Sequence, residues 1–406
     1  DTMKDNSSMS GPDVGEKHLE AHIENIWTNI LNQDLLFPDC NVSHYLRPVD
    51  PNYFESVLNK VQNVTHTNHL YDMFVGGTNV VILRKTLEEL FVEPRFTAES
   101  RKKTADAIFE RLSLYTLETQ KQKFVATGSN GRPVEGTNVI GVIPGRNRGQ
   151  AGNGLIVIGA HYDTVQSSPG VDDNGSGVVA LLETARILSP KMGRFNNTII
   201  FVAFDLGEKG ILGSLAFVNQ FLIPHEIVRK RGKFIGAYIA DMVMNFDANV
   251  GSQVMPLEIS MAVTNVSALL QLNGLRGDFL SIWARRTIDW ELWYNFQRSW
   301  AQEEASTEHR LTIIDPPIPR VPLFISNWRY RNFMRSDHAA FWNHKNPAFK
   351  DSLKAVLITD MGPWRGNLRA CYHEFCDDRR QITLENLDFL RHVIDSLASA
   401  VATLAE

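Results

Sequence analysis

The run Leu155-Ile-Val-Ile-Gly-Ala160, which leads directly into His161-Tyr-Asp-Thr164, indicates how the chain folds. An uninterrupted apolar run of this length is typical of a β-strand that is buried on both faces. A second such run is Thr198-Ile-Ile-Phe-Val-Ala-Phe204, and between the two the segment 177–188 has the periodicity of an amphipathic helix. Two buried strands separated by a helix predict a parallel sheet that is covered by helices.

Further strands are expected on either side of this unit. They are the β-branched run at 138–144 and the apolar runs at 234–240 and 355–359. Helical patterns occupy 214–221 and 382–404. Alternation of doubly buried strands with helices predicts an α/β fold, a three-layer sandwich with a mostly parallel central sheet flanked by helices.

The rest of the chain has a different texture. Residues 1–16 are polar and are expected to be a disordered N-terminus, and 17–130 read as a mainly helical N-terminal region. The α/β domain is expected over 131–406. Within it, a Trp- and Arg-rich segment at about 253–333 resembles an insertion or lid, and its tryptophans are more typical of core than of a substrate pocket.

Composition excludes several classes of protein. The 406 residues are 43% hydrophobic and 21% charged, which is usual for globular chains. A net charge of −5 without a basic stripe argues against nucleic-acid binding. No apolar run reaches the roughly 18 residues of a transmembrane helix. The sequence does not indicate the oligomeric state.

Several marks favour a secreted or lumenal protein. Asn-x-Ser/Thr sequons begin at Asn6, Asn41, Asn63, Asn196 and Asn265, which favours glycosylation in the secretory pathway. A sixth triplet at Asn174 falls in a candidate site loop and is discounted. Of the three cysteines, Cys371 and Cys376 are close enough for a small disulfide loop, and Cys40 has no evident partner.

Metal-ligating residues follow the ends of the predicted strands, where open α/β sheets form their sites. In chain order they are His161, Asp173, Glu208, Asp241 and His373. Imidazoles and carboxylates suit zinc, and a shared carboxylate can hold two ions ~3.5–4 Å apart. Asp172 is an alternative to Asp173, and whichever is not a ligand is expected to cap the next helix. Two zinc ions are therefore the expected cofactors.

Two further residues have candidate roles around such ions. Asp163, two positions after His161, is placed to accept the second N–H of the imidazole. Tyr372 could donate a hydrogen bond to a developing oxyanion. By contrast, the pair His18 and His22 has no glutamate in the position of a His-Glu-x-x-His site, and we exclude it.

The series of motifs resembles that of the co-catalytic zinc aminopeptidases, a superfamily that includes glutaminyl cyclases and the ectodomains related to transferrin receptor. The motifs are His161-Tyr-Asp-Thr, Ser168-Pro-Gly-Val-Asp-Asp-Asn-Gly-Ser-Gly177, Glu208-Lys-Gly-Ile-Leu-Gly-Ser214, Asp241-Met242, Ser336-Asp-His338 and Tyr372-His-Glu-Phe-Cys-Asp377. The resemblance implies that Asp173 bridges two ions, that His338 is on the substrate side, and that the substrate is a peptide. Arg335 is a candidate for binding a substrate carboxylate, although a solvated arginine is equally consistent with the sequence.

Position 207 departs from the family pattern, which has two adjacent glutamates before Gly-Ile-Leu-Gly-Ser. The second, a ligand, matches Glu208, but the first, the general base, is replaced by Gly207. Loss of such a base costs roughly 10²–10⁴-fold in rate. Asp205 is a candidate substitute on the substrate side, and Gly207→Glu is expected to raise activity. The resemblance thus predicts a secreted dinuclear-zinc aminopeptidase, with an inactive binding ectodomain or a glutaminyl cyclase-like enzyme as alternatives.

Overall fold

The computed structural model describes residues 77–406 except 129, 303–307 and 319–327, and for 328–330 it describes the backbone alone. These residues fall within one compact unit, Asn68–Glu406. The expected disordered segment 1–16, the histidines His18 and His22, Cys40 and the sequons at Asn6, Asn41 and Asn63 lie outside the described residues.

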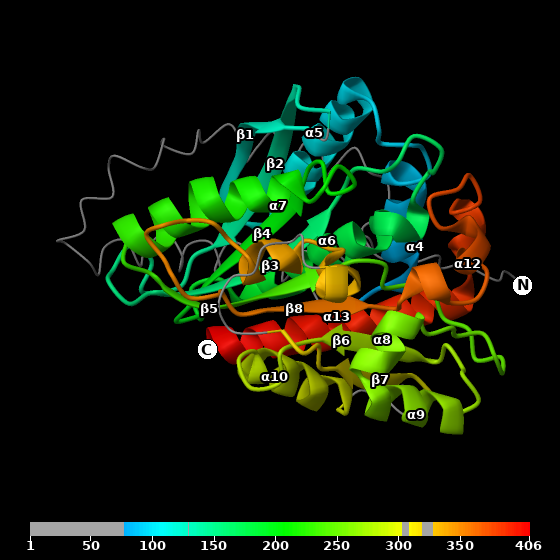
Figure 1. The fold of residues 1–406 in the computed structure, drawn as a ribbon. Helices are drawn as coiled ribbons and strands as arrows, with labels where there is room; N and C mark the ends of the chain where they lie inside the picture. Colours follow the sequence, from blue (N-terminus) through cyan, green and yellow to red (C-terminus); the bar gives the residue numbers. More distant parts are fainter. Residues whose placement is uncertain (1–76, 129, 303–307, 319–327) are drawn as a thin grey trace, which may run out of the picture. The chain divides into compact units, whose positions relative to one another are not determined.

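An eight-stranded sheet forms the centre of this unit (Figure 1). Its spatial order is β1-β2-β4-β3-β5-β8-β6-β7, and four of its seven strand pairings are parallel. The strands are β1 (Glu118–Thr127), β2 (Pro133–Ile143), β3 (Gly154–His161), β4 (Thr198–Phe204), β5 (Lys233–Ala240), β6 (Phe279–Trp283), β7 (Arg310–Ile314) and β8 (Ala355–Thr359).

Side chains of successive strand residues point to opposite faces of the sheet, and each face has its own core. In β3, Ile156 and Ile158 belong to one hydrophobic cluster, whereas Leu155 and Val157 belong to the other. All four are completely buried. This explains why the run that opens β3 is apolar at every position.

Helices cover both faces. The first cluster is closed by α4 (Val80–Leu90), α5 (Ala98–Tyr115), α6 (Gly177–Leu188), α10 (Trp290–Trp300) and α13 (Leu384–Ala405). Figure 1 shows α10 lying along α13, and the two helices are in extensive contact. The second cluster is closed by α7 (Leu212–Ala216), the π-helical η5 (Phe217–Arg229), α8 (Leu257–Ala262), α9 (Thr264–Leu272) and α11 (His338–Trp342).

The predicted fold class is confirmed, because helices flank a sheet in three layers. The helix expected at 177–188 is α6, and the one expected at 382–404 is α13. No described helix has both the length and the apolar character needed to cross a membrane.

Two regions differ from the sequence analysis. The described part of the expected helical region contains α4 and α5, but residues 118–127 form β1 and pair with β2, so the expected boundary at 130 falls in the turn of a β-hairpin. The segment 253–333 adds β6 and β7 to the sheet, where an insertion or lid was expected. Both strands of that segment are only five residues long, and such short runs among tryptophans and arginines carry little periodic signal.

Candidate active site

The parallel register of the sheet brings distant side chains to one edge. His161, the last residue of β3, pairs with Phe204, the last residue of β4. Asp205 therefore begins the chain segment that carries Glu208 at the same edge, and Asp241 follows directly after β5. The carboxyl ends of β3, β4 and β5 thus supply three of the five predicted metal ligands.

Three of these residues form a group in which His161 and Asp173 are buried and Asp241 is partly exposed. His161 Nε2 lies 3.6 Å from Asp173 Oδ1 and 3.7 Å from Asp241 Oδ1. One ligand-type atom from each of the three side chains lies within 4.8 Å of the other two. We call His161, Asp173 and Asp241 the inner group.

A second group shares one member with the first. His373 Nε2 lies 3.3 Å from Asp173 Oδ2 and 3.2 Å from Glu208 Oε1. We call Asp173, Glu208 and His373 the outer group; its ligand-type atoms also lie within 4.8 Å of one another. The two oxygens of Asp173 face different imidazoles, so this carboxylate lies between two potential metal positions.

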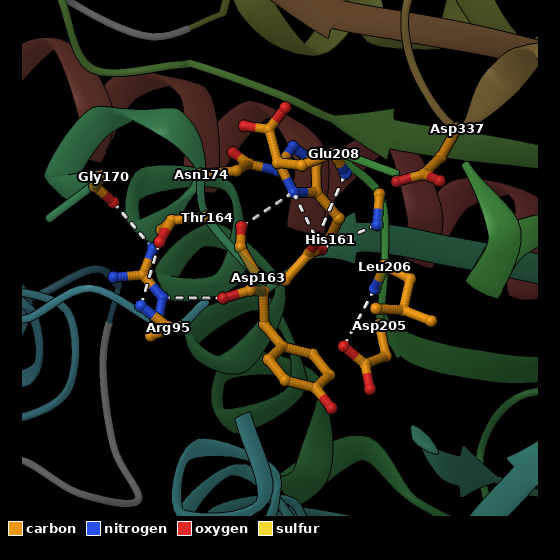
Figure 2. A network of polar contacts seen from close by, with 12 residues as sticks. Arg95, His161, Asp163, Thr164, Gly170, Asn174, Asp205, Leu206, Glu208 and Asp337 are labelled. Atoms are coloured by element: carbon orange, nitrogen blue, oxygen red, sulfur yellow. Dashed lines mark hydrogen bonds and ion pairs between the residues drawn. The ribbon is translucent and has the colours of Figure 1, made fainter. Parts of the chain in front are cut away.

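Asp163 holds the inner group in place. His161 Nδ1 lies 3.2 Å from the backbone carbonyl oxygen of Asp163 and 3.5 Å from its Oδ1. The carboxylate also accepts hydrogen bonds from the backbone N–H groups of Gly207, at 2.7 Å, and Glu208, at 3.2 Å (Figure 2). An Nδ1–H directed toward Asp163 leaves Nε2 of His161 free to bind a metal.

The loop that carries Asp173 is fixed by a carboxylate from the C-terminal part of the chain. Asp377 accepts hydrogen bonds from the backbone N–H groups of Asp172 and Asp173, both at 2.9 Å. Asp172 is turned away from the two groups, and its Oδ1 accepts a hydrogen bond from Met244 N at 3.1 Å. Of the two candidates in this loop, Asp173 is therefore the one that faces the imidazoles.

Arg95 was not expected at the site. It precedes α5 and is buried, and its guanidinium donates hydrogen bonds to the backbone carbonyls of Tyr162, at 2.6 Å, and Gly170, at 2.8 Å, among others (Figure 2). Burial lowers the pKa of Arg95 to about 10, while nearby carboxylates, above all Asp377, oppose this shift. Arg95 thus ties the end of β3 to the loop before Asp173.

The protonation of the two imidazoles reflects their carboxylate neighbours. Burial disfavours a charged His161, yet Asp163 and Asp241 hold the pKa of His161 well above its ordinary value. Burial likewise opposes charge on His373, but Asp173 and Glu208 raise the pKa of His373 to about 10. Without a metal, protons therefore occupy the position that a cation would fill.

Gly207 has no room for a side chain in this arrangement. A Cβ atom built on Gly207 would lie 2.5 Å from both Cβ and Cγ of His161 and 2.9 Å from its Nδ1. Contacts below 3.0 Å force a neighbour to move. The structure therefore revises the expectation that Gly207→Glu raises activity, since the new side chain would displace His161.

Two residues predicted on the substrate side lie elsewhere. Asp205 forms a buried ion pair with Arg101 Nε at 2.9 Å and accepts a hydrogen bond from Thr137 N, and Figure 2 shows it turned away from Glu208. His338 is completely buried, and its Nε2 binds the carbonyl of Phe333 at 2.9 Å. Neither lines the pocket above the two groups, because strand parity and motif position do not report where a side chain points.

The pocket itself has aromatic and charged walls. Trp283 and Trp364 line it with nearly parallel rings, 7° apart in orientation and 6.4 Å between centroids. Tyr372 stacks on His373 at 3.8 Å, and burial, together with the negative charges of Asp173 and Glu208, raises the pKa of Tyr372. Arg335 lines the pocket as well and donates a hydrogen bond to the Tyr372 hydroxyl.

Two other expectations concern covalent features. Cys371 and Cys376 form a disulfide that closes the loop carrying Tyr372 and His373. Asn196 and Asn265 are exposed, as a glycan acceptor must be. Asn174 is completely buried, which agrees with discounting its triplet.

Comparison with known proteins adds family information. Residues 138–268 match peptidase family M28. Leucine aminopeptidase 1 from Metarhizium robertsii is 32% identical over 151 residues, which cover 34% of this chain and 37% of that protein. The chain thus spans less than half the length of this curated relative.

Solved structures share the fold. A zinc aminopeptidase from Bacillus subtilis superposes with a TM-score of 0.54 at 16% identity and covers 81% of this chain and 95% of its own. A glutaminyl cyclase from Bacteroides thetaiotaomicron has a TM-score of 0.51 at 12% identity and covers 81% and 99%. The ordered motifs and the M28 match over residues 138–268 thus support a relationship to the co-catalytic zinc aminopeptidases and glutaminyl cyclases, whose fold the solved structures share.

Proposed function

We propose that this protein is a metallo-exopeptidase that removes N-terminal residues from peptides and holds two zinc ions in the inner and outer groups. The observation that carries the proposal is the carboxylate of Asp173, whose oxygens face two imidazoles at 3.6 and 3.3 Å. A carboxylate shared in this way suits paired ions in peptidases.

The side chains present fit zinc. Two imidazoles and three carboxylates are its usual nitrogen and oxygen ligands. His373 Nε2 lies 3.3 and 3.2 Å from carboxylate oxygens of Asp173 and Glu208, so a cation bound there would meet one nitrogen and two oxygen ligands. When bound, the ions would polarise the scissile carbonyl and lower the pKa of a water molecule.

The protein's own residues would prepare this chemistry. Asp163 keeps the proton of His161 on Nδ1, so that Nε2 remains a ligand. The Tyr372 hydroxyl, held by Arg335 at 3.2 Å, would donate a hydrogen bond to negative charge that develops on the carbonyl oxygen.

Asp337 is our candidate for the proton acceptor that position 207 lacks. It lines the pocket but belongs to neither metal group, and Ser214 Oγ donates a hydrogen bond to its Oδ1 at 2.5 Å. Its Oδ2 is buried without a hydrogen-bond partner among the described residues. Burial raises the pKa of Asp337 to about 7, so its carboxyl group at the pocket wall would accept a proton from the attacking water near neutral pH once Oδ2 turns toward the pocket.

The test joins zinc analysis to a substrate panel. We expect two zinc ions per chain and release of free amino acids from aminoacyl substrates, with Asp337→Asn lowering kcat at least about 10²-fold while both ions remain. Absence of bound zinc would overturn the proposal. Zinc without turnover would favour the binding ectodomain, and pyroglutamyl product from a Gln-peptide would favour the cyclase.

We also propose that the protein functions outside the cytosol. The disulfide Cys371–Cys376 is of a kind that persists in oxidising compartments. Exposed sequons at Asn196 and Asn265 support the same location. Endoglycosidase treatment of protein from a secreting host should reduce its apparent mass, and an unchanged mass would argue against this location.

A further inference from the structure

Arg335 presents an oriented positive charge at the pocket. Its guanidinium carbon lies 5.4 Å from the ring centroid of Trp364 and 5.7 Å from that of Tyr372, and Nη2 donates to the Tyr372 hydroxyl at 3.2 Å. Contacts with two aromatic faces restrict where the guanidinium can point. The arginine is exposed and yet held in one direction.

This charge has no acidic partner within the described part of the chain. Several other arginines of the unit form ion pairs, as Arg101 does with Asp205 and Arg285 with Asp289. For Arg335, the polar partner in the structure is the neutral tyrosine hydroxyl. A planar guanidinium with free N–H donors is suited to bidentate binding of a carboxylate.

The position of Arg335 relative to the metal groups defines which carboxylate it can reach. Tyr372 connects the two, because its hydroxyl contacts Arg335 while its ring stacks on His373 at 3.8 Å. A peptide whose scissile carbonyl lies at the outer group would pass over Tyr372. Consecutive Cα atoms are about 3.8 Å apart, so the residue directly after the scissile bond would come beside the guanidinium.

The other charged side chains of the pocket also favour Arg335 as the position for a carboxylate. Asp173, Glu208, Asp241 and Asp337 all line it and would repel a carboxylate brought near them. Among the described residues that line the pocket, the basic side chains are His161 and Arg335. A negatively charged substrate group is therefore favoured at one position in the pocket.

We propose that Arg335 binds a carboxylate on the residue that follows the scissile bond, and that this carboxylate is the free C-terminus of a dipeptide. The inference rests on the proposed peptidase function and narrows it to short substrates. A side-chain carboxylate at the same residue offers the same chemistry, and the experiment separates the two sources.

The first experiment compares three substrates with the zinc-loaded protein. They are Leu-Leu, Leu-Leu-amide, which lacks the carboxylate, and Leu-Glu-amide, which moves it to a side chain. We expect kcat/KM for Leu-Leu to exceed that for Leu-Leu-amide at least about ten-fold, mainly through KM, because a charge-assisted pair is worth that factor. Equal values for these two substrates would overturn the inference. Preference for Leu-Glu-amide over Leu-Leu would overturn the assignment to the C-terminus.

Variants identify the residue responsible. Arg335→Met should bring the ratio between acid and amide to within about two-fold of unity, and Arg335→Lys should restore part of it. Arg331→Met removes an exposed arginine four positions away, outside the pocket lining, and should leave the ratio unchanged. A ratio that survives Arg335→Met would overturn the inference.

A binding measurement separates this inference from the proposed hydrolysis. A reduced-bond analogue of Leu-Leu, with CH₂–NH in place of the amide, cannot be cleaved. Its Kd should be at least about ten-fold lower than that of the corresponding C-terminal amide, and Arg335→Met should abolish the difference. Such a result with a protein that hydrolyses nothing would support the carboxylate site while rejecting the peptidase. Equal Kd values would reject the carboxylate site itself.

Discussion

The inner and outer groups use the same kinds of side chain but are built differently. The side chain of His161 in the inner group is 7% exposed and comes from the end of a buried strand, whereas that of His373 is 35% exposed and lies on a loop closed by a disulfide. Asp163 orients the inner imidazole, while the outer one stacks on Tyr372. The sheet therefore preorganises one of the two proposed metal positions, and a local covalent loop preorganises the other.

The largest effect is expected at the residue that the two groups share. Asp173→Asn should remove both ions and lower kcat/KM by about 10³-fold or more, because it removes a ligand charge from each position. Metal analysis and kinetics measure this. Glu374→Gln, an exposed carboxylate beside His373, is the control and should behave like the wild type. Retention of one tightly bound ion by Asp173→Asn would show that the groups are independent.

Single imidazole replacements should expose the difference between the groups. His161→Ala and His373→Ala should each lower the zinc content from two ions to one, with loss of about 10²-fold or more in activity. His161→Ala should also weaken folding more, because it leaves a cavity and unpaired carboxylates at the end of β3. Thermal unfolding of the metal-free variants measures this, and equal stabilities would contradict the comparison.

Opening the disulfide should affect one group. Replacement of Cys371 and Cys376 by serine frees the loop that carries His373 while leaving the inner residues untouched. We expect the zinc of the outer group to lose about 10–100-fold in affinity, the range found when support of a ligand is removed. Titration with a competing chelator measures the affinity of each of the two ions. An equal loss at both positions would mean that the loop also supports the inner group.

Zinc binding should weaken as the pH falls. The pKa of His161 and that of His373 are both raised in the metal-free protein, so each imidazole carries a proton at pH 7 that zinc must displace. Apparent affinity should therefore rise with pH by up to about ten-fold per unit for each displaced proton. Calorimetry in buffers of different ionisation enthalpy counts these protons, and binding without proton release would contradict the assignment.

The smallest effect concerns Gly207. Even Gly207→Ala places a Cβ against the ring of His161, so we expect the inner zinc to bind several-fold more weakly while the outer zinc is unaffected. Gly210→Ala is a control for loop composition, because a Cβ there meets no atom within 4 Å, although the positive φ of Gly210 costs some stability. Stronger inner binding in Gly207→Ala would show that the ring has room to move.

Much of this arrangement was predictable because strand ends combine two signals. An apolar run marks the strand, and the first polar residues after it mark the edge, as for His161 and Asp241. Asp173 could be preferred to its neighbour Asp172 only through the resemblance of its motif to that of the zinc aminopeptidases. The prediction of two zinc ions is an inference from the same residues and remains a proposal.

Other features left no readable signal. Arg95 donates its hydrogen bonds to backbone carbonyls. Every residue has such a carbonyl, so the sequence does not show which ones an arginine will bind. Asp205 has the right chemistry at the right strand end, yet a buried pairing with Arg101 turns it away. The short strand β6 depends on β8, which it joins, and β7 in turn depends on β6, so their local sequence does not specify them.

The contact between Gly207 and His161 has a consequence for how such a site can evolve. Once an imidazole rests against a glycine, any larger residue at that position is harmful until the imidazole has moved. A glutamate at position 207 therefore requires a second change that moves the imidazole. As long as His161 keeps its place, a proton acceptor has to come from another wall of the pocket.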